Sequence, residues 1–253
     1  MDERHGVEGV VLDLDGCVLE DSGHVAIHAL AALRVALERF RARGGSVVLC
    51  SGRPASFMEA VALVLGHAGP LLFEWGSGLI NDVYQGTPEY HPALTRHYFE
   101  ARRAFVEFIQ TETNPRYGSW IQPGKDVATT IFLREHGHME AVAGEIHRYL
   151  EENDGLSQMT VHRKSRYIDV RPAQVDKAGG FRWLLSRGGR PPASRWLAIG
   201  DSLDDCSLFR ECGLAGCPSN GDESARAHAH LISSESYLKG VLEVLGLCGI
   251  THA

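Results

Sequence analysis

Short apolar runs alternate with helix-like stretches over the first third of the chain. Between the first two runs, apolar residues recur at helical spacing within 24–43, and Pro54 suits the first turn of a second helix. Strand–helix–strand units of this kind predict a parallel sheet with right-handed crossovers. The apolar runs predict strands buried on both faces, at residues 9–14, 46–50 and 71–74.

The pattern changes after about Tyr84, where a polar helical stretch and β-branched runs replace the simple alternation. Helices are predicted at 92–110 and 139–151, and strands at 126–133, 159–162 and 167–171. A loop rich in Pro, Gly and Asn is expected after Gln110. This part of the chain, residues 84–170, is therefore predicted to form a separate α+β insertion.

The alternation of helix and strand resumes at Lys177, which opens a predicted helix. A strand at 196–199, a helix at 203–212 and a short strand at 214–217 follow. The sequence therefore predicts an α/β protein with a doubly wound, Rossmann-like parallel-sheet core. The core consists of residues 1–83 and 171–253, and the α+β domain is inserted between them.

Composition narrows the class of protein. The 253 residues carry a net charge of −7 and contain no strongly basic stretch, which argues against nucleic acid as the main partner. No apolar run approaches the ~20 residues of a membrane span, and the charged N-terminus lacks a signal-peptide core. The six cysteines form no CxxC pair. We therefore expect a cytoplasmic protein without a nucleic-acid or membrane partner, either a monomer or a homodimer.

Four polar motifs lie at predicted strand ends or helix starts of the core. Carboxyl ends of parallel strands meet at one edge of the sheet, so the motifs can converge although they lie far apart in the sequence. Two carboxylates directly after a strand can hold a divalent cation and attack phosphorus. The motifs are Asp13-Leu14-Asp15-Gly16, Ser51-Gly52, Lys177 and Gly200-Asp201-Ser202-Leu203-Asp204-Asp205.

This order of motifs resembles that of haloacid dehalogenase superfamily phosphatases. The insertion between the second and third motifs resembles the type C2 cap, more closely the C2B subclass of sucrose-phosphate, mannosyl-3-phosphoglycerate and archaeal phosphoglycolate phosphatases. The loop 216–221, which contains Asn220, also resembles a loop of these enzymes. Two positions depart from the family pattern, since Asp204 and Trp75 stand where the family often has Asn. Trp75 can narrow the site entrance or stack on a sugar face.

The resemblance assigns roles to the first motif. Asp13 is expected to be the nucleophile that forms an aspartyl-phosphate, and Asp15 to protonate the leaving oxygen and later activate water. Mg²⁺ prefers oxygen ligands, which Asp13 and Asp201 can supply, and the resemblance adds the backbone carbonyl of Asp15.

The remaining motifs supply positive charge and hydrogen bonds. Ser51 and the Gly52 amide are expected to bind the phosphoryl oxygens, and Lys177 to neutralise both Asp13 and the phosphate. Three further residues, Asp204, Asp205 and Asn220, are expected to hold these groups in place without contacting the substrate themselves. Asp205 is expected to orient Lys177 or a metal-bound water.

Cations of the insertion are candidates for a second anionic group of the substrate. They are Lys125, Arg163 and Arg166, although long basic side chains usually face water. We therefore predict a Mg²⁺-dependent phosphomonoester hydrolase acting on a small phosphorylated metabolite: a sugar phosphate, a phosphoglycerate or phosphoglycolate. A phosphosugar mutase of the same superfamily and a non-catalytic phosphometabolite-binding module are the alternatives.

Overall fold

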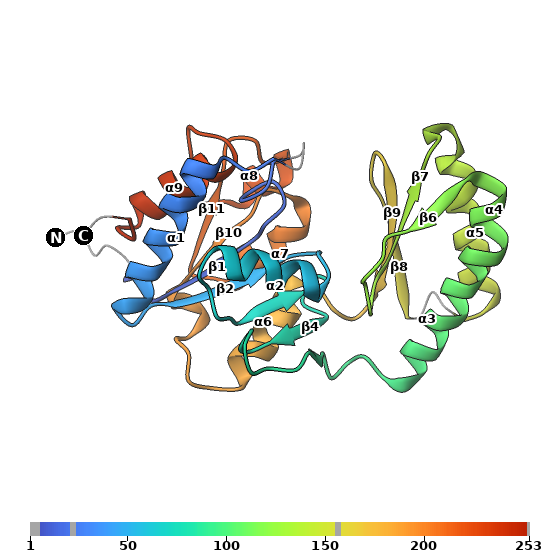
Figure 1. Cartoon of the computed structure of the whole chain (residues 1–253), viewed down its shortest axis with the longest axis horizontal. Coiled ribbons are helices and arrows are strands. Elements are labelled where there is room, and N and C mark those ends of the chain that lie inside the picture. The colour runs from blue at the N-terminus through green and yellow to red at the C-terminus, as the bar shows by residue number, and fades with distance from the viewer. Residues whose placement is uncertain (1–5, 21–23, 155–157, 252–253) are drawn as a thin grey trace. The chain divides into compact units, whose positions relative to one another are not determined.

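The computed structural model describes residues 6–20, 24–154 and 158–251, and it divides the chain into two compact units (Figure 1). The first unit consists of residues 1–89 and 176–253, and the second of Tyr90–Val175. The limits predicted from the sequence, 84 and 170, each lie a few residues earlier, and the second one falls inside a strand.

The first unit is built on a largely parallel sheet with strand order β12-β11-β10-β1-β2-β3-β4-β5. Neighbouring strands from β12 to β3 run parallel, and β4 alone in the described pairings is antiparallel to its neighbour. The strands are β1 (Gly9–Leu12), β2 (Ser46–Cys50), β3 (Leu71–Phe73), β4 (Gly78–Ile80), β5 (Glu89–Tyr90), β10 (Trp196–Ile199), β11 (Leu214–Cys217) and β12 (Leu231–Ile232).

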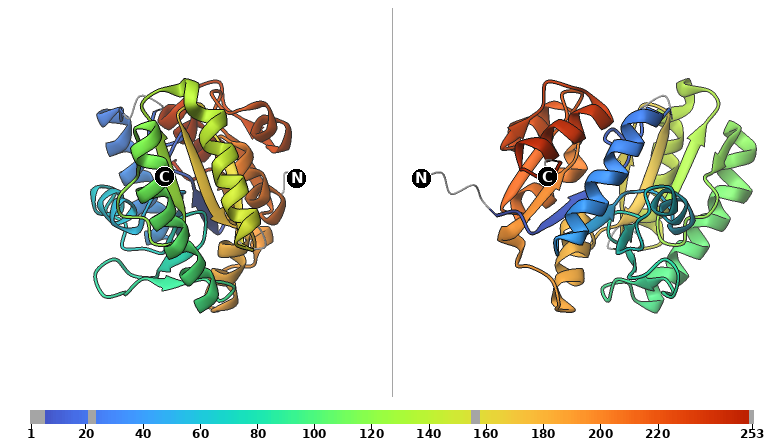
Figure 2. Two further views of the ribbon diagram at one scale, coloured as in Figure 1. Left: turned by 90° about the vertical axis from the view of Figure 1, so that its right-hand side faces the viewer. Right: turned by 60° about the vertical axis from the view of Figure 1, so that its left-hand side comes forward.

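Helices cover both faces of this sheet, as the two views of Figure 2 show. Successive residues of a strand point to opposite faces, so Val10 and Leu12 pack with one group of helices and Val11 packs with the other. The first group is α1 (Ile27–Ala42), α2 (Ala55–Val64) and α9 (Tyr237–Leu247). The second group is α6 (Lys177–Ser186), α7 (Cys206–Glu211) and α8 (Glu223–His228). The predicted doubly wound α/β fold is confirmed.

Strand register brings three of the predicted motifs to one edge of the sheet. Leu12, the last residue of β1, pairs with Leu49 of β2 and with Ile199, the last residue of β10. Residues that follow these strands therefore leave the sheet at the same level, and the Asp13 amide donates to the carbonyl of Ile199 at 3.0 Å. Parallel pairing thus positions the ends of β1, β2 and β10 side by side.

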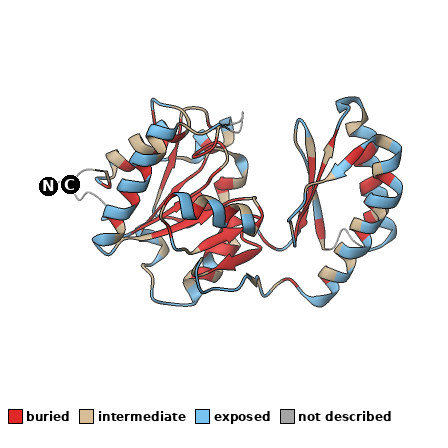
Figure 3. Cartoon of the chain, viewed as in Figure 1, coloured by how far each residue is buried: buried red, intermediate tan, exposed pale blue. Residues whose placement is uncertain are grey.

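The second unit is a four-stranded antiparallel sheet whose apolar face packs against helices. Its strand order is β6-β7-β9-β8, and Ile131, Ile168 and Val170 join the buried cluster beneath the helices. Figure 3 shows the buried residues along these strands and on the helix faces turned toward them. The elements are α3 (Arg96–Phe108), α4 (Asn114–Tyr117), β6 (Ser119–Ile121), β7 (Thr129–Leu133), α5 (Met139–Glu152), β8 (Met159–Arg163) and β9 (Tyr167–Pro172).

The structure corrects the loop that was expected after Gln110. The backbone continues from α3 through a π-helical segment, Ile109–Thr113, into α4, and it ends at Gly118 with φ of 62°. Pro115 comes just after the π-helical segment, where the regular pattern of α-helical hydrogen bonds is already interrupted, so the run tolerates it. Four short strands, β4, β5, β6 and β12, were not predicted, since two or three residues are too few to show an alternating pattern. The helices α8 and α9 were not predicted either.

Within the described residues, no helix is both long enough and apolar enough to cross a lipid bilayer.

A buried histidine links α1 to the turn before β3. Arg41 Nη1 lies 2.8 Å from His67 Nδ1, and His67 Nε2 lies 3.3 Å from the carbonyl oxygen of Pro70. Arginine can only donate, so Nδ1 is the acceptor and Nε2 carries the proton of a neutral imidazole. Burial lowers the pKa of His67 to about 4, and the nearby Arg41 charge adds to this effect against the Pro70 hydrogen bond.

We expect this histidine to make stability fall with pH between about 6.5 and about 4. In that window the unfolded chain binds a proton that the folded chain excludes, so the free energy of unfolding drops by as much as ~3 kcal/mol as the pH is lowered. Urea unfolding at a series of pH values would measure this loss. The His67→Gln variant should show a smaller loss over the same window, and parallel curves for the two proteins would contradict the expectation.

Candidate active site

The loop after β1 is a tight turn that presents Asp13 and Asp15. The carbonyl of Leu14 accepts hydrogen bonds from the amides of Val18 and Leu19, both at 2.8 Å, which closes the turn. Gly16 has φ of +73°, and a Cβ at this position would lie 1.9 Å from Asp201 Oδ2. Only glycine therefore lets the first motif approach the carboxylate of the fourth.

A buried lysine joins two of the aspartates. Lys177 Nζ lies 2.9 Å from Asp13 Oδ2 and 2.6 Å from Asp205 Oδ1, and its side chain is only 2% exposed. Asp13 Oδ1 accepts a hydrogen bond from the Leu14 amide at 2.8 Å. Both oxygens of Asp13 thus have a donor, and the ammonium holds the carboxylate in a fixed position.

Asp205 supports this arrangement from beneath. Its Oδ2 accepts from the amides of Asp201 and Ser202 and from the Ser202 hydroxyl, each at 3.1 Å. Its Oδ1 accepts from Lys177, so the fully buried carboxylate ties the loop after β10 to the start of α6. Asp205 therefore orients Lys177 and the main chain of Asp201 at once.

A third carboxylate, that of Asp201, lies close to the two that contact Lys177. Oxygens of Asp13, Asp201 and Asp205 lie within 4.8 Å of one another. Among the described residues, these three side chains form the group that could hold a metal ion. Burial raises the pKa of Asp13 well above its usual range, and the carboxylates around it add to this effect against the pull of Lys177. Burial would lower the pKa of Lys177, but Asp13 and Asp205 raise it above its usual value, so the ammonium stays charged.

The second motif approaches the site from β2. Ser51 is fully buried, and its Oγ donates to Asp15 Oδ2 at 3.4 Å and accepts from the Arg53 amide at 3.3 Å. Trp75 packs against Gly52 so closely that a Cβ on the glycine would lie 2.5 Å from the indole ring. Trp75, only 9% exposed, lies under the loop that contains Gly52.

Sequence reasoning missed Arg53, the residue that contacts the Asp15 carboxylate most. Its Nε lies 3.0 and 2.9 Å from the two oxygens of Asp15, and its Nη2 lies 2.5 Å from Oδ1. Its place directly after Ser51-Gly52, in the loop that follows β2, was a signal that could have pointed to it.

The loop after β11 supports the first and fourth motifs. Asn220 Nδ2 donates to the carbonyl of Gly16 at 2.9 Å, and its Oδ1 accepts from the Tyr237 amide at 2.6 Å. Asp222, which was not predicted, donates its amide to the Asp201 carbonyl at 2.7 Å and accepts from the Leu203 amide at 2.8 Å. The start of a helix after Asn-Gly-Asp was the available signal for it, since Asp222 also caps α8.

The other predicted residues have different surroundings. Asp204 is half-buried and lies outside the group of three carboxylates. In the second unit, Lys125 Nζ donates to Thr130 Oγ1 at 2.6 Å and lies 3.8 Å from Asp169, with its side chain 4% exposed. Arg163 pairs with Glu140 at 2.5 Å, and Arg166 is exposed. Substrate contacts of these three cations stay predictions.

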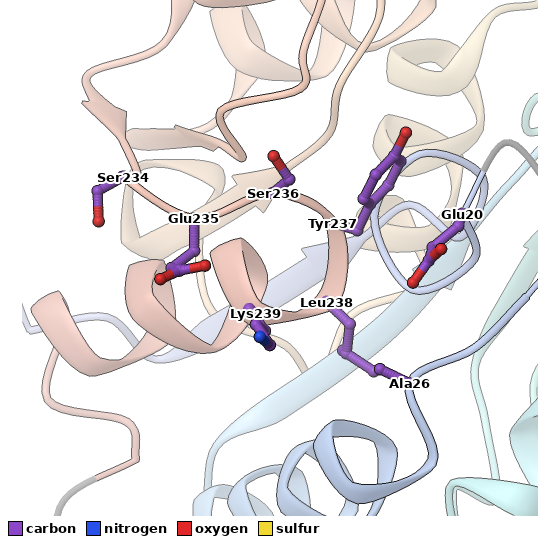
Figure 4. Close-up of a pocket in the computed structure, with 8 residues that line it drawn as sticks. All are labelled: Glu20, Ala26, Ser234, Glu235, Ser236, Tyr237, Leu238 and Lys239. Atoms are coloured by element: carbon purple, nitrogen blue, oxygen red, sulfur yellow. The ribbon is translucent and has the colours of Figure 1, made fainter.

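A separate hollow lies at the start of α9 (Figure 4). Its charged side chains are Glu20, Glu235 and Lys239, and none of the predicted site residues lines it. The chemistry therefore concentrates at the edge of the sheet around Asp13.

Comparison with known proteins identifies the family. The model of the haloacid dehalogenase-like hydrolases matches residues 10–101 and 95–245, so the chain belongs to this family. Among curated relatives, the phosphoglycolate phosphatase of Methanosarcina acetivorans is 24% identical over 242 residues, which cover 94% of this chain and 95% of that one. The phosphoglycolate phosphatase of Methanopyrus kandleri is 23% identical over 239 residues, which cover 93% and 94%.

Solved structures show the same fold. Thermoplasma acidophilum 0175 superposes with a TM-score of 0.74 at 19% identity and covers 97% of this chain and 100% of its own. A haloacid dehalogenase-like hydrolase from Bacteroides thetaiotaomicron superposes with a TM-score of 0.69 at 21% identity, covering 95% and 98%. The predicted superfamily and the predicted enzyme class, a phosphatase, are confirmed.

The position of Lys177 depends on a close approach between two glycines. A Cβ on Gly180 of α6 would lie 2.4 Å from the Cα of Gly76, in the loop after β3. We expect Gly180→Ala to push α6 away, to destabilise the fold by ~1–3 kcal/mol and to lower phosphatase turnover by ~10- to 100-fold as Lys177 moves. Denaturant unfolding and turnover of p-nitrophenyl phosphate would measure the two effects.

Gly179→Ala is the matched control, because its Cβ would meet only the ends of two side chains, Asp176 Oδ1 at 3.2 Å and Arg182 Nη2 at 3.9 Å. Since alanine favours a helix over glycine, this variant should be neutral or more stable by up to ~1 kcal/mol. Equal losses in the two variants would contradict the role given to the Gly76–Gly180 contact.

Proposed function

We propose that the protein is a Mg²⁺-dependent phosphomonoester hydrolase that forms an aspartyl-phosphate on Asp13. The observation that carries this proposal is the buried chain from Asp13 through Lys177 to Asp205, with Asp201 beside it. A carboxylate held by a fixed ammonium in a dry site can attack phosphorus, because the positive charge offsets the repulsion between two anions.

The donor set suits a hard divalent cation. Three carboxylates lie close together, Lys177 contacts two of them, and burial raises the pKa of Asp13, so the group as it stands has an excess of negative charge. Asp205 Oδ2 already accepts three hydrogen bonds and its Oδ1 accepts from Lys177, whereas each Asp13 oxygen has one partner. We therefore propose Asp13 and Asp201, with the main-chain carbonyl of Asp15, as the ligands. Bound Mg²⁺ would supply charge that neutralises the phosphoryl oxygens.

The proposed reaction has two steps at Asp13. In the first, an Asp13 oxygen forms a bond to phosphorus, the ester P–O bond breaks, and the leaving oxygen takes the proton of the Asp15 carboxyl. In the second, water attacks the aspartyl-phosphate, its proton passes to the Asp15 carboxylate, and phosphate leaves. Lys177, the Ser51 hydroxyl and the Gly52 amide would hold the phosphoryl oxygens in both steps.

The substrate we propose is a small phosphorylated metabolite of the sugar phosphate, phosphoglycerate or phosphoglycolate class. Relatives that match over more than nine-tenths of this chain bear the name phosphoglycolate phosphatase, which supports the last of these. Their identities of 24% and 23% leave the part of the molecule beyond the phosphate open.

Removal of the nucleophile or the metal should abolish phosphate release. We expect Asp13→Asn to lower turnover by at least ~10³-fold and EDTA to reduce wild-type turnover to background, with recovery on adding Mg²⁺. Phosphate release from phosphoglycolate, phosphoglycerates and a panel of sugar phosphates would measure both. Full activity of Asp13→Asn would refute the mechanism, and activity that requires a bisphosphate activator and yields an isomer would indicate a mutase instead.

Two neighbouring aspartates allow a matched test of the support beneath Lys177. Asp205→Asn removes a buried charge that pairs with Lys177, so we expect turnover to fall by ~100-fold or more and the protein to lose ~3–5 kcal/mol of stability. Asp204→Asn changes a half-buried carboxylate one residue earlier and should stay within ~3-fold of wild type. Steady-state turnover and urea unfolding of both variants would decide, and comparable losses in the two would contradict the assignment.

A further inference from the structure

Asp15 differs from the other carboxylates of the site in how it is held. Its side chain is 46% exposed, whereas those of Asp13 and Asp205 are 6% and 1% exposed. The main chain of Asp15 is fixed, because it bridges to Leu19 within the closed turn. The direction of its carboxylate therefore depends on the side chains around it.

Arg53 supplies that control through a fork of hydrogen bonds. The guanidinium contacts both carboxylate oxygens, with N–O distances of 3.0, 2.9 and 2.5 Å. A planar fork against a planar carboxylate fixes both position and orientation, which a single point charge does not.

The guanidinium is itself held in place by its neighbours. Its central carbon lies 4.6 Å from the centre of the ring of Phe57, a residue in the first turn of α2. Its amide donates to Ser51 Oγ, and the same hydroxyl donates to Asp15 Oδ2. Two residues of one loop, Ser51 and Arg53, thus hold the Asp15 carboxylate through hydrogen bonds.

We propose that Arg53 is the positioning residue that aims the Asp15 carboxyl at the oxygen of the leaving group. The proposal rests on the proposed function, in which Asp15 gives a proton to that oxygen as the ester P–O bond breaks and takes one from water in the second step. Without Arg53 the half-exposed side chain would sample other rotamers, and proton transfer would lag behind bond breaking.

A series of leaving groups separates this role from substrate binding. Proton donation matters most when the leaving group is a strongly basic alkoxide and least when it is the weakly basic nitrophenolate. We expect Arg53→Met to lower kcat for an alkyl phosphate by ~10- to 100-fold and to leave kcat for p-nitrophenyl phosphate within ~3-fold. Arg53→Lys keeps the charge without the fork, so its kcat for the alkyl phosphate should lie between those of wild type and Arg53→Met.

Two reference variants complete the experiment. Asp15→Asn, which lacks the proton donor, should give the same dependence on leaving group in stronger form. Arg187→Met is the matched control, because Arg187 also forks onto a carboxylate, Glu89, at 2.9 and 2.5 Å, and packs over Trp183 at 5.0 Å. It follows the C-terminal end of α6, while Lys177 lies at the other end, so its loss should not alter the dependence on leaving group.

The outcomes separate the positioning role of Arg53 from the proposed function. If Asp15→Asn steepens the dependence and Arg53→Met lowers every substrate by one factor, or none, the positioning role is refuted while the proposed function stands. If Asp15→Asn itself leaves the dependence unchanged, the proton-donor role of Asp15 falls, and the inference falls with it. A midpoint of thermal unfolding within a few degrees of wild type confirms that Arg53→Met is folded.

Discussion

The structure of the site depends on one buried ammonium. Lys177 lies at the first turn of α6 and is removed from water, which costs several kcal/mol for any ion unless partners surround it. Asp13 and Asp205 provide those partners from two different strand ends. The lysine therefore requires that β1, β10 and α6 stay in their present arrangement, and each carboxylate it contacts is oriented as a consequence.

Parallel strand pairing makes this arrangement possible. Because β1 pairs in register with both β2 and β10, their C-terminal residues end at one level, and the residues after them enter the same space. The start of α6 then brings Lys177 to that edge, and the turn before α7, a helix on the same face of the sheet, brings Asp205. Residues that lie more than 160 positions apart in the chain meet there, since Asp13 and Lys177 are separated by 164 positions, the difference between 177 and 13.

Much of this could be predicted from the sequence, because a charged residue is costly to bury inside a strand and is therefore expected at the end of the strand, at the edge of the sheet. Most strands of the sheet, the helices α1, α2, α6 and α7 and the confirmed fold class follow from apolar runs and helical spacing, and the motifs at their ends mark the edge of the sheet. The helices α8 and α9 were not predicted. What escaped prediction depends on contacts across the fold. The partnership of Arg53 with Asp15 and the hydrogen bond of the Asp222 amide to Asp201 join segments whose distance no local pattern encodes. The continuation from α3 to α4 was missed because Pro115 counts against a continuous helix.

The extent to which each charged group is buried agrees with the role proposed for it. A nucleophile and the ammonium that holds it benefit from exclusion of water, since their interaction weakens as the dielectric rises, and both are almost completely buried. A residue that exchanges protons with a leaving group and then with water must reach both, and Asp15 is the half-exposed member of the set. Exposure alone would leave its direction undefined. A second, partly exposed group defines it: the guanidinium of Arg53, whose side chain is 33% exposed and which lies over the Phe57 ring. Order in this half of the site thus comes from the geometry of one ion pair, and in the other half from burial.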